Sequence, residues 1–455
     1  MTKRFFAALL FSAPIIAFAQ DSSFRIRDYR YRTDGFRALA LDIGLSGSNV
    51  SSDNPFSQKK KQSNLFLAPS NISYYRIISQ EKRWHESTIS LSSSYQYWRS
   101  NAGIAEEKVR SFQGGVTSAR TDRFYRGRSF FEIGNTFSAT VNGSKQESGI
   151  SNFTNNRNQL SGTLIFGIGK GRIEYVQDAQ MASFILNDLA TQGLLQGVPE
   201  KDNYDEFARL LTDINNRRVF DSRRRRIYEL TRIDSFLRNR GLAPSGDIRV
   251  FTTVNDNWAL AFNPFRSSGT ILYLRLQPSI RLNRNLFEEK VLAPVYRSDD
   301  NLQTAGLSPV LGFEKYLPLS LRWQSDFGIR VNWQRSWSWK TYKEKNGPNT
   351  METKTYSDQT QLGSYAYYHL GFYPNNRTVV DAYLNMLAQY GGAYKWDLTP
   401  ELQLSANYFL GYRTRLTAFV YARQNYYTIV DAQNQKLAGN LKTGSFSLGL
   451  THFIL

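Results

Sequence analysis

The stretch that decides the fold runs from Leu319 to Lys340 and reads LSLRWQSDFGIRVNWQRSWSWK. Up to Trp333, nearly every odd-numbered position holds an apolar or aromatic side chain, and nearly every even-numbered position holds a polar or charged one. Only a β-strand, whose side chains alternate between two faces, separates such sets. The stretch therefore predicts a strand with one apolar and one polar face.

Two tryptophans indicate where that apolar face lies. Trp323 and Trp333 share it and are ten residues apart, which is roughly 33 Å along a strand that rises about 3.3 Å per residue. A tilt of about 45° reduces this to roughly 23 Å along a membrane normal, close to the ~25 Å between the aromatic girdles of a transmembrane barrel. Both tryptophans are therefore predicted to be membrane-girdle residues.

The same alternation recurs along the chain and predicts about 14 antiparallel strands, with 12 to 16 left open. A soluble β-sandwich also alternates, but its strands usually hold about five or six residues, whereas several segments here stay in phase for about twelve or more. The predicted spans are 36–48, 63–79, 84–98, 107–123, 127–142, 158–172, 269–282, 304–317, 319–339, 361–373, 378–389, 391–398, 401–420 and 441–455. The pattern favours an all-β transmembrane barrel over a sandwich.

On these residues the chain resembles a Gram-negative outer-membrane β-barrel over most of residues 36–455. Residues 444–455 are similar to the terminal signal that the barrel-assembly machinery reads, although the chain ends in Leu455 and its aromatic residue, Phe453, comes two positions earlier. The resemblance implies a surrounding of outer-membrane lipid and lipopolysaccharide, the assembly machinery as a partner, and both chain ends in the periplasm. Longer polar connections are then expected on the outer side, near residues 49–62, 143–157, 283–303, 340–360 and 421–440.

The start of the chain predicts export. Residues 1–19 hold two early basic residues, an apolar run and the sequence AFA at 17–19, the pattern of a cleaved signal peptide. Residues 20–35 would then form a short N-terminal periplasmic segment, with the protein in the outer membrane. The formal charge of +19 would suggest nucleic acid in a cytosolic protein, but an exported chain rarely meets nucleic acid, so none is expected. The chain contains no cysteine, which excludes disulfides and thiolate metal sites.

A segment with helical periodicity, residues 173–268, interrupts the barrel between a first part, 36–172, and a second part, 269–455. Residues 173–216 hold eight acidic and two basic side chains, and residues 217–247 hold nine basic and four acidic ones. The two halves of the insert therefore complement each other in charge. Because the insert follows an even-numbered strand, it replaces a periplasmic turn, and it either hangs below the barrel or folds up to plug it.

Capping residues predict where the helices of the insert begin and end. Asp178 is expected to cap a first helix that ends at Gly193, and Asp221 is expected to cap a later helix that ends at Gly241. Acidic residues favour helix starts because they accept bonds from unpaired backbone amides, and glycine favours helix ends because it adopts a left-handed conformation.

Four consecutive arginines begin that later helix. Arg223 and Arg226 fall on the same side as its apolar residues, whereas Arg225 faces away. Buried arginines in a first helical turn oppose the helix dipole and need carboxylate partners. Arg223 and Arg226 are therefore predicted to clamp the insert by bridging to its acidic helices or to the barrel wall, for example to Asp326 or Asp381, while Arg225 is left free.

The inward positions of the strands predict a polar lumen. The residues expected to line it or to bind solute are Arg275, Arg322, Asp326, Arg330, His369, Asp381 and Arg413. Such groups can simply satisfy one another, or their arginines can form a basic ladder that favours anionic solutes in a pore.

The sequence offers little support for an enzyme activity or a metal site. The three histidines, His85, His369 and His452, show no metal-ligand spacing and no hydrolase pattern, so no enzyme activity, cofactor or metal is expected. The sequence predicts a porin-like channel for small or anionic solutes, with an insert that gates or plugs the lumen. The alternative is a closed barrel that serves as a scaffold or as a secretion or assembly accessory, and whose insert docks a periplasmic partner.

Overall fold

The computed structural model describes residues 24–42, 46–54, 57–102, 105–148, 151–216, 222–244, 246–259, 266–291, 295–391, 394–411, 414–430 and 436–452. The strands are β1 Thr33–Asp42, β2 Ser46–Asn54, β3 Ser57–Ser79, β4 Arg83–Ala102, β5 Ala105–Arg126, β6 Ser129–Glu147, β7 Ser151–Tyr175, β8 Ser267–Val291, β9 Tyr296–Pro318, β10 Trp323–Asn346, β11 Asn349–Asn375, β12 Thr378–Gly391, β13 Tyr394–Gly411, β14 Thr414–Val430 and β15 Lys436–His452. A short 3-10 turn, η1 Ile26–Asp28, precedes them, and the helices α2 Gln177–Thr191, α3 Lys201–Asn216, α4 Ser222–Asn239 and α5 Ile248–Trp258 lie between β7 and β8. The predicted signal peptide, residues 1–19, lies outside the described residues.

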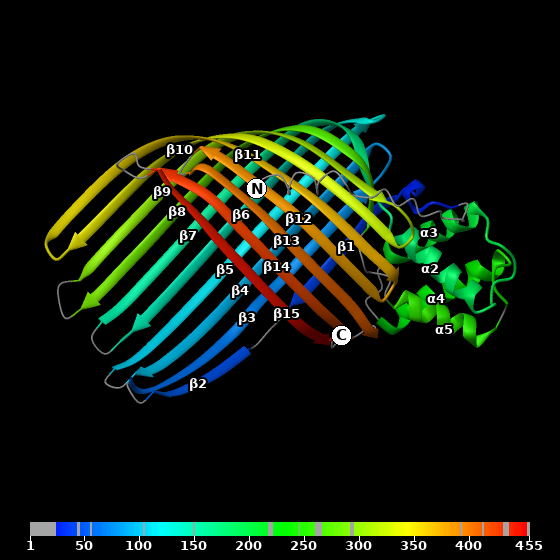
Figure 1. The fold of residues 1–455 in the computed structure, drawn as a ribbon, viewed down its shortest axis with the longest axis horizontal. Coiled ribbons are helices and arrows are strands. Elements are labelled where there is room, and N and C mark those ends of the chain that lie inside the picture. The colour runs from blue at the N-terminus through cyan, green and yellow to red at the C-terminus, as the bar shows by residue number, and fades with distance from the viewer. Residues whose placement is uncertain are drawn as a thin grey trace, which may run out of the picture.

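All described strands belong to one antiparallel sheet that curls into a barrel (Figure 1). Each strand pairs with the next in sequence, except that β1 and β2 pair with the two ends of β3, where β1 takes its C-terminal half and β2 its N-terminal half. These two therefore occupy one strand position, and the described sheet has 14 positions along its path. The predicted fold class and strand number are confirmed.

The strands are longer than predicted at the end opposite the helices. β10 has 24 residues and β11 has 27, so β10 alone measures roughly 79 Å at about 3.3 Å per residue, far more than an apolar band of ~25 Å requires. The two pair as far as Asn346 and Asn349, and Gly347 turns the chain with a φ of 58°. The prediction of a long loop at 340–360 was wrong, because a tight turn lets the strands project instead.

Two predicted strand boundaries were also wrong. The spans 391–398 and 401–420 were taken as separate strands, but β13 runs unbroken from Tyr394 to Gly411, and β14 begins at Thr414 and returns along it. Alternation continues through so short a turn, because the turn changes the direction of the chain without breaking the period of two. Arg413, predicted to face the lumen, lies outside the described residues.

The outward face of the sheet carries a continuous belt of apolar side chains. Exposed examples from neighbouring strands are Ile89, Leu91, Phe131, Ile133, Phe137, Leu160, Leu164, Ile168, Leu272, Leu274, Leu276, Ile280, Phe327, Ile329, Val331, Trp333, Leu402, Leu404, Leu416 and Val420. An exposed apolar surface of this extent is far larger than soluble monomers show. It matches the lipid-facing band of a transmembrane barrel.

The sheet order begins at β1 and ends at β15, and the described residues contain no ladder between these two strands. Leu39 of β1 is 68% exposed and Leu448 of β15 is 76% exposed, against 48% for Ile89 on an interior strand. The difference is what a missing neighbour on one side produces. In the described part of the chain, β1 and β15 are therefore edge strands.

The four helices form a bundle beyond one end of the barrel rather than between its walls (Figure 1). Their shared apolar core includes Ile185, Phe207, Leu211 and Ile233, and it also takes in the N-terminal segment through Ile26. No helix in the described residues is both long and apolar enough to cross a membrane. Of the two placements predicted for the insert, the structure has the one below the barrel.

Candidate functional site

A cavity of about 600 Å³ lies on the inward face of β9 to β12. It is lined by Arg266, Ser267, Tyr316, Gln324, Asp326, Arg330, Tyr365, Tyr367, His369, Tyr373, Asp381, Tyr383 and Asn385. Register places these side chains together, because Tyr316, Asp326, His369 and Tyr383 stand directly opposite one another on the four strands. Four of the predicted lumenal residues, Asp326, Arg330, His369 and Asp381, are thus brought into one cavity.

His369 is the centre of this cavity. Its Nδ1 lies 2.8 Å from Asp326 Oδ2 and its Nε2 lies 2.9 Å from Asp381 Oδ1. Its ring stacks on Tyr383, with ring centroids 4.2 Å apart and planes within 9°. Because both ring nitrogens are engaged by carboxylates, the imidazole is fixed in place and is not placed to act as a free base. Among the described residues no cluster of three or more histidine and acidic side chains suits a metal ion.

Two of the predicted lumenal arginines, Arg330 and Arg275, are paired with buried glutamates. Arg330 Nη2 donates to Glu314 Oε1 at 2.9 Å, and Tyr273 donates to the same oxygen at 2.9 Å. Arg275 donates to the fully buried Glu132, which also accepts from Arg123 at 2.7 Å. The charge of each glutamate offsets that of its arginine. At these positions the inward face therefore carries compensated pairs, whereas Arg157 and Arg281, also inward, have no ion pair among the described residues.

Three further predicted positions can be located. Arg322 is not lumenal: β10 begins at Trp323, and Arg322 lies exposed on the preceding turn, where its amide donates to Ser320 Oγ at 3.2 Å. Alternation from 319 to 323 was misleading because a turn can continue the period of a strand. Trp323 and Trp333 do share the outward face of β10, and Trp323 contacts Phe372 of β11 at a centroid distance of 4.4 Å.

Arg266 is a residue that the sequence did not single out. It is 1% exposed and donates to three backbone carbonyls of the turn before β10, at Ser320, Leu321 and Trp323, over 2.6 to 2.9 Å. Its guanidinium also lies 4.8 Å from the ring centroid of Tyr373. A single arginine just ahead of a strand has no periodic signal, so only the tertiary fold reveals this anchor.

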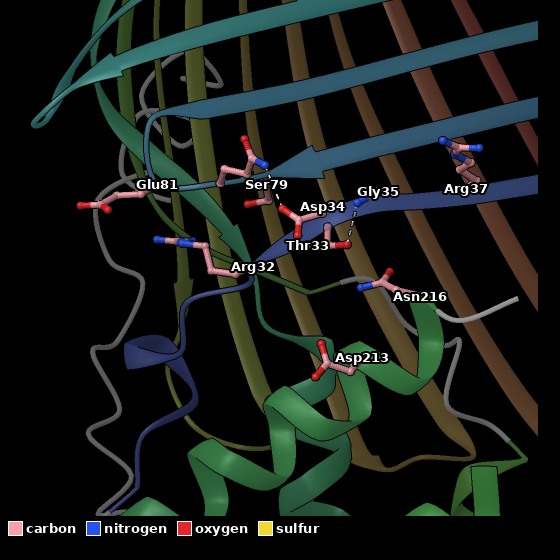
Figure 2. Close-up of a pocket in the computed structure, with 10 residues that line it drawn as sticks. Arg32, Thr33, Asp34, Gly35, Arg37, Ser79, Glu81, Asp213 and Asn216 are labelled. Atoms are coloured by element: carbon pink, nitrogen blue, oxygen red, sulfur yellow. Dashed lines mark hydrogen bonds between the residues drawn. The ribbon is translucent and has the colours of Figure 1, made fainter. Parts of the chain in front are cut away.

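A second cleft, of about 830 Å³, opens between the start of β1 and the C-terminal end of α3 (Figure 2). From the barrel side it is lined by Arg32, Asp34 and Glu81, and from α3 by Asp213 and Asn216. Figure 2 shows the α3 side chains directed toward the barrel end. The cleft is a polar gap between the barrel wall and the bundle.

Specific polar contacts attach the bundle to the short turns of the barrel. Asn257 of α5 accepts a bond from Asn376 at 2.6 Å and donates to Asp188 of α2 at 2.8 Å. Beside it, Arg377 pairs with Asp256. Gln180 of α2 reaches the turn before β10. Because contacts come from two turns and two helices, the bundle is held in a defined position against the barrel.

The arginines at the start of α4 have partners that the sequence did not predict. Arg226 donates to the side chain and carbonyl of Asn255 on α5, both at 2.8 Å, and lies 3.9 Å from Glu229 of its own helix. These partners lie on α5 and on α4 itself, so the predicted bridge to the acidic helices or the barrel wall stays a prediction. The helix packs against α5 and also against α3, where Phe236 stacks on Phe207 at a centroid distance of 5.0 Å. Arg225, predicted to be free, pairs with Glu229 at 2.7 Å. The side chain of Arg223 lies outside the described residues.

Glycine ends two helices as predicted, but the predicted cap at Asp178 was wrong. Gly193 and Gly241 have φ angles of 66° and 63°. Asp178 lies inside α2 and accepts bonds from Thr212 at 2.6 Å and Asn215 at 3.1 Å, both on α3. The prediction for Asp221 falls outside the described residues. The acidic residue near the start of α2 thus joins two helices instead of capping one.

The buried network around Asp178 reaches the N-terminal segment. Tyr29 lies 2.6 Å from Thr212 Oγ1, and because Thr212 donates its proton to Asp178, Tyr29 donates to Thr212. Burial raises the pKa of Asp178 from 3.8 to about 6, although the bonds from Thr212 and Asn215 act in the opposite direction. The carboxyl therefore binds its proton more tightly in the folded bundle than in the unfolded chain.

This shift predicts that the bundle becomes more stable as the pH falls. The stabilisation is fully present below about pH 4, where both states are protonated, and is lost as the pH rises through about 6, a change of roughly 3 kcal/mol. Thermal melts of the helical signal at 222 nm should show this gain between pH 7 and 4. Asp178→Asn should melt with a smaller pH dependence; an unchanged dependence would contradict the assignment to Asp178.

The sheet, its apolar belt and its polar inward face together define an antiparallel transmembrane β-barrel with a helical bundle at one end. No protein-family model matches the chain, and no curated protein does either.

Solved structures with a similar arrangement of the chain include three with different activities. The translocator domain of the autotransporter NalP from Neisseria meningitidis is 10% identical, with 82% of this chain and 89% of that chain covered and a TM-score of 0.28. The ferric yersiniabactin uptake receptor FyuA from Yersinia pestis is 7% identical, with 90% and 72% covered and a TM-score of 0.33. A deltaS2 mutant of the monoaromatic hydrocarbon channel TodX is 9% identical, with 92% and 90% covered and a TM-score of 0.28. With TM-scores of this size, none of them indicates a function for this chain.

Proposed function

We propose that the protein is an outer-membrane channel for small polar solutes, with the helical bundle on the periplasmic side of the barrel. The observation that carries this proposal is the cavity of about 600 Å³ on the inward face of β9 to β12. Tyrosine rings supply apolar surface there and carboxylates, amides and arginines supply hydrogen bonds, the mixture that small-molecule sites use. Export through a cleaved signal peptide remains part of the proposal.

The charge pairing in the lumen refines the class of solute. Because Arg330 is paired with Glu314, and Arg275 with Glu132, a passing anion meets little net positive charge on these walls. Small polar solutes without a strong charge preference fit this lining better than anions do.

Planar bilayer recordings test the channel. The full chain should give stepwise conductance with weak ion selectivity. Arg330→Gln leaves Glu314 uncompensated and should shift selectivity toward cations, whereas Glu314→Gln should shift it toward anions, each by up to roughly fivefold in permeability ratio at low salt. Lys343→Gln is the matched control, because Lys343 lies on the outward face of β10 and pairs with Glu352. Equal selectivity in both lumenal variants would contradict the placement of this pair in a conducting pore.

A second candidate function is a closed barrel whose bundle docks a periplasmic partner. It is favoured by a groove of about 530 Å³ between α4 and α5. Ile227, Ile248 and Phe251 along these helices are 58%, 69% and 49% exposed, which is unusual for large apolar residues and typical of interaction surfaces. In the same recordings, folded protein that gives no conductance at all would favour this scaffold over the channel.

A further inference from the structure

Arginines form a row across the outward face of the barrel near the bundle. Arg37 of β1 stands directly opposite Arg76 of β3, Arg76 opposite Ser87 of β4, and Ser87 opposite Arg120 of β5. The register therefore places three guanidinium groups along one line over four adjacent strand positions. Since neighbouring strands are about 4.8 Å apart, the row spans roughly 15 Å.

The row belongs to the outward face, because the positions two residues farther along carry the apolar belt. Leu39, Tyr74 and Ile89 stand opposite one another in the next row away from the bundle. At about 3.3 Å per residue, that row begins only about 7 Å from the arginines. The arginines thus lie directly beside the apolar belt on the outward face.

Two of the three arginines in this row have no acidic partner among the described residues. In the described part of the chain Arg37 and Arg76 have no ion pair or hydrogen bond, and Arg76 Nε is buried without a partner. Like charges directly opposite each other on a sheet are destabilising. Two facing arginines with an unsatisfied buried nitrogen therefore indicate an anion that binds between them.

Asp122, the acidic residue beside Arg120, is already shared among several donors. Asp122 accepts from Arg120 at 2.6 Å and from Arg83 at 2.9 Å, and lies 2.9 Å from His85 Nδ1. Arg120 and Arg83 remain 56% and 40% exposed, and Arg83 Nε is also buried without a partner. Asp122 orients these cations toward the surface but leaves an excess of positive charge.

We infer that Arg37, Arg76 and Arg120 bind the phosphate group of an anionic phospholipid in the leaflet nearer the bundle. Guanidinium groups bind phosphate oxygens through paired donors, and the belt residues above the row offer the apolar surface on which the acyl chains lie. The inference rests on the proposed placement of the barrel in a membrane. It does not depend on whether the lumen conducts.

The test is lipid binding by the full chain in nanodiscs of phosphatidylcholine with increasing phosphatidylglycerol, read as the shift in melting temperature and as lipid retained in native mass spectrometry. The double variant Arg76→Gln/Arg120→Gln should lower the apparent affinity for phosphatidylglycerol roughly thirty-fold. Each arginine accounts for about fivefold of this loss. Arg110→Gln is the matched control, since Arg110 lies on the same face of β5 near the opposite end. It should bind as the unmodified protein does.

Further arms distinguish the sources of phosphate and the effects of misfolding. Arg76→Lys/Arg120→Lys keeps both charges and should retain most of the binding, and each variant should show the gel mobility shift of a folded barrel on heating.

Inorganic phosphate at millimolar concentration should not displace the lipid; displacement would point to a soluble anion and overturn the lipid assignment. Equal binding by the glutamine variant, or no preference for phosphatidylglycerol over phosphatidylcholine, would also overturn it. Unaltered conductance in the glutamine variant would separate this site from the channel.

Discussion

Replacing Glu132 by glutamine is expected to destabilise the folded barrel by about 3–5 kcal/mol, because it leaves two largely buried arginines without their shared counter-charge. The Glu132 side chain is 1% exposed, and its partners Arg123 and Arg275 are 12% and 16% exposed. The measurement is the urea midpoint of the barrel, followed by the loss of its heat-sensitive gel mobility.

Glu147→Gln provides the control, because Glu147 lies on the same strand, is partly exposed, and pairs with Lys145. Ion pairs at the surface contribute little to stability because water and salt screen them, so its midpoint should hardly move. If Glu132→Gln and Glu147→Gln unfold at the same urea concentration, the paired charges inside the wall do not stabilise the barrel in the way described.

Arg266→Ala is expected to cost about 4 kcal/mol, because it removes charged hydrogen bonds to three backbone carbonyls, at roughly 1.5 kcal/mol or more each. The loss should concentrate at the turn before β10, which also receives Gln180 of α2. Hydrogen exchange should therefore increase in that turn and in α2 before it increases in the far ends of the strands.

The neighbouring Arg322→Ala serves as the control for this change. Arg322 lies on the same turn but is exposed, so its loss should change exchange little. A uniform increase over the whole barrel in Arg266→Ala, or equal exchange in both variants, would contradict the role of Arg266 as a local anchor of the turn.

The class of fold could be predicted from sequence because a barrel wall imposes a period of two on every strand. Leu319–Lys340 showed that period, and β10 follows it from Trp323 onward. The ends of strands could not be predicted in the same way. Alternation passes unbroken through the turn between Gly411 and Thr414, and polar side chains on β10 and β11 suggested a loop where the hairpin in fact projects.

The lumenal cavity was predictable in part. Asp326, His369 and Asp381 were predicted because each occupies a position of its strand that alternates with the apolar, outward ones. Their mutual contacts follow from the register of the strands. Arg266 and the counter-charges Glu132 and Glu314 were missed. Their roles depend on which strands become neighbours and on how a turn folds back, and neither property has a local signal in the chain.

The shared core of the bundle has a consequence for the order of folding. Phe24 stacks on Tyr204 at 5.2 Å, and Tyr29 and Thr212, which are hydrogen-bonded, are 183 residues apart in the chain. Contacts of such sequence separation form late, since the intervening chain must first be brought together. The strands β1 to β7 occupy that interval, so the N-terminal segment can join the core of the bundle only when this long stretch of chain has brought its two ends together. The docking of the N-terminal segment on α3 is therefore expected to be a late step in the folding of the bundle.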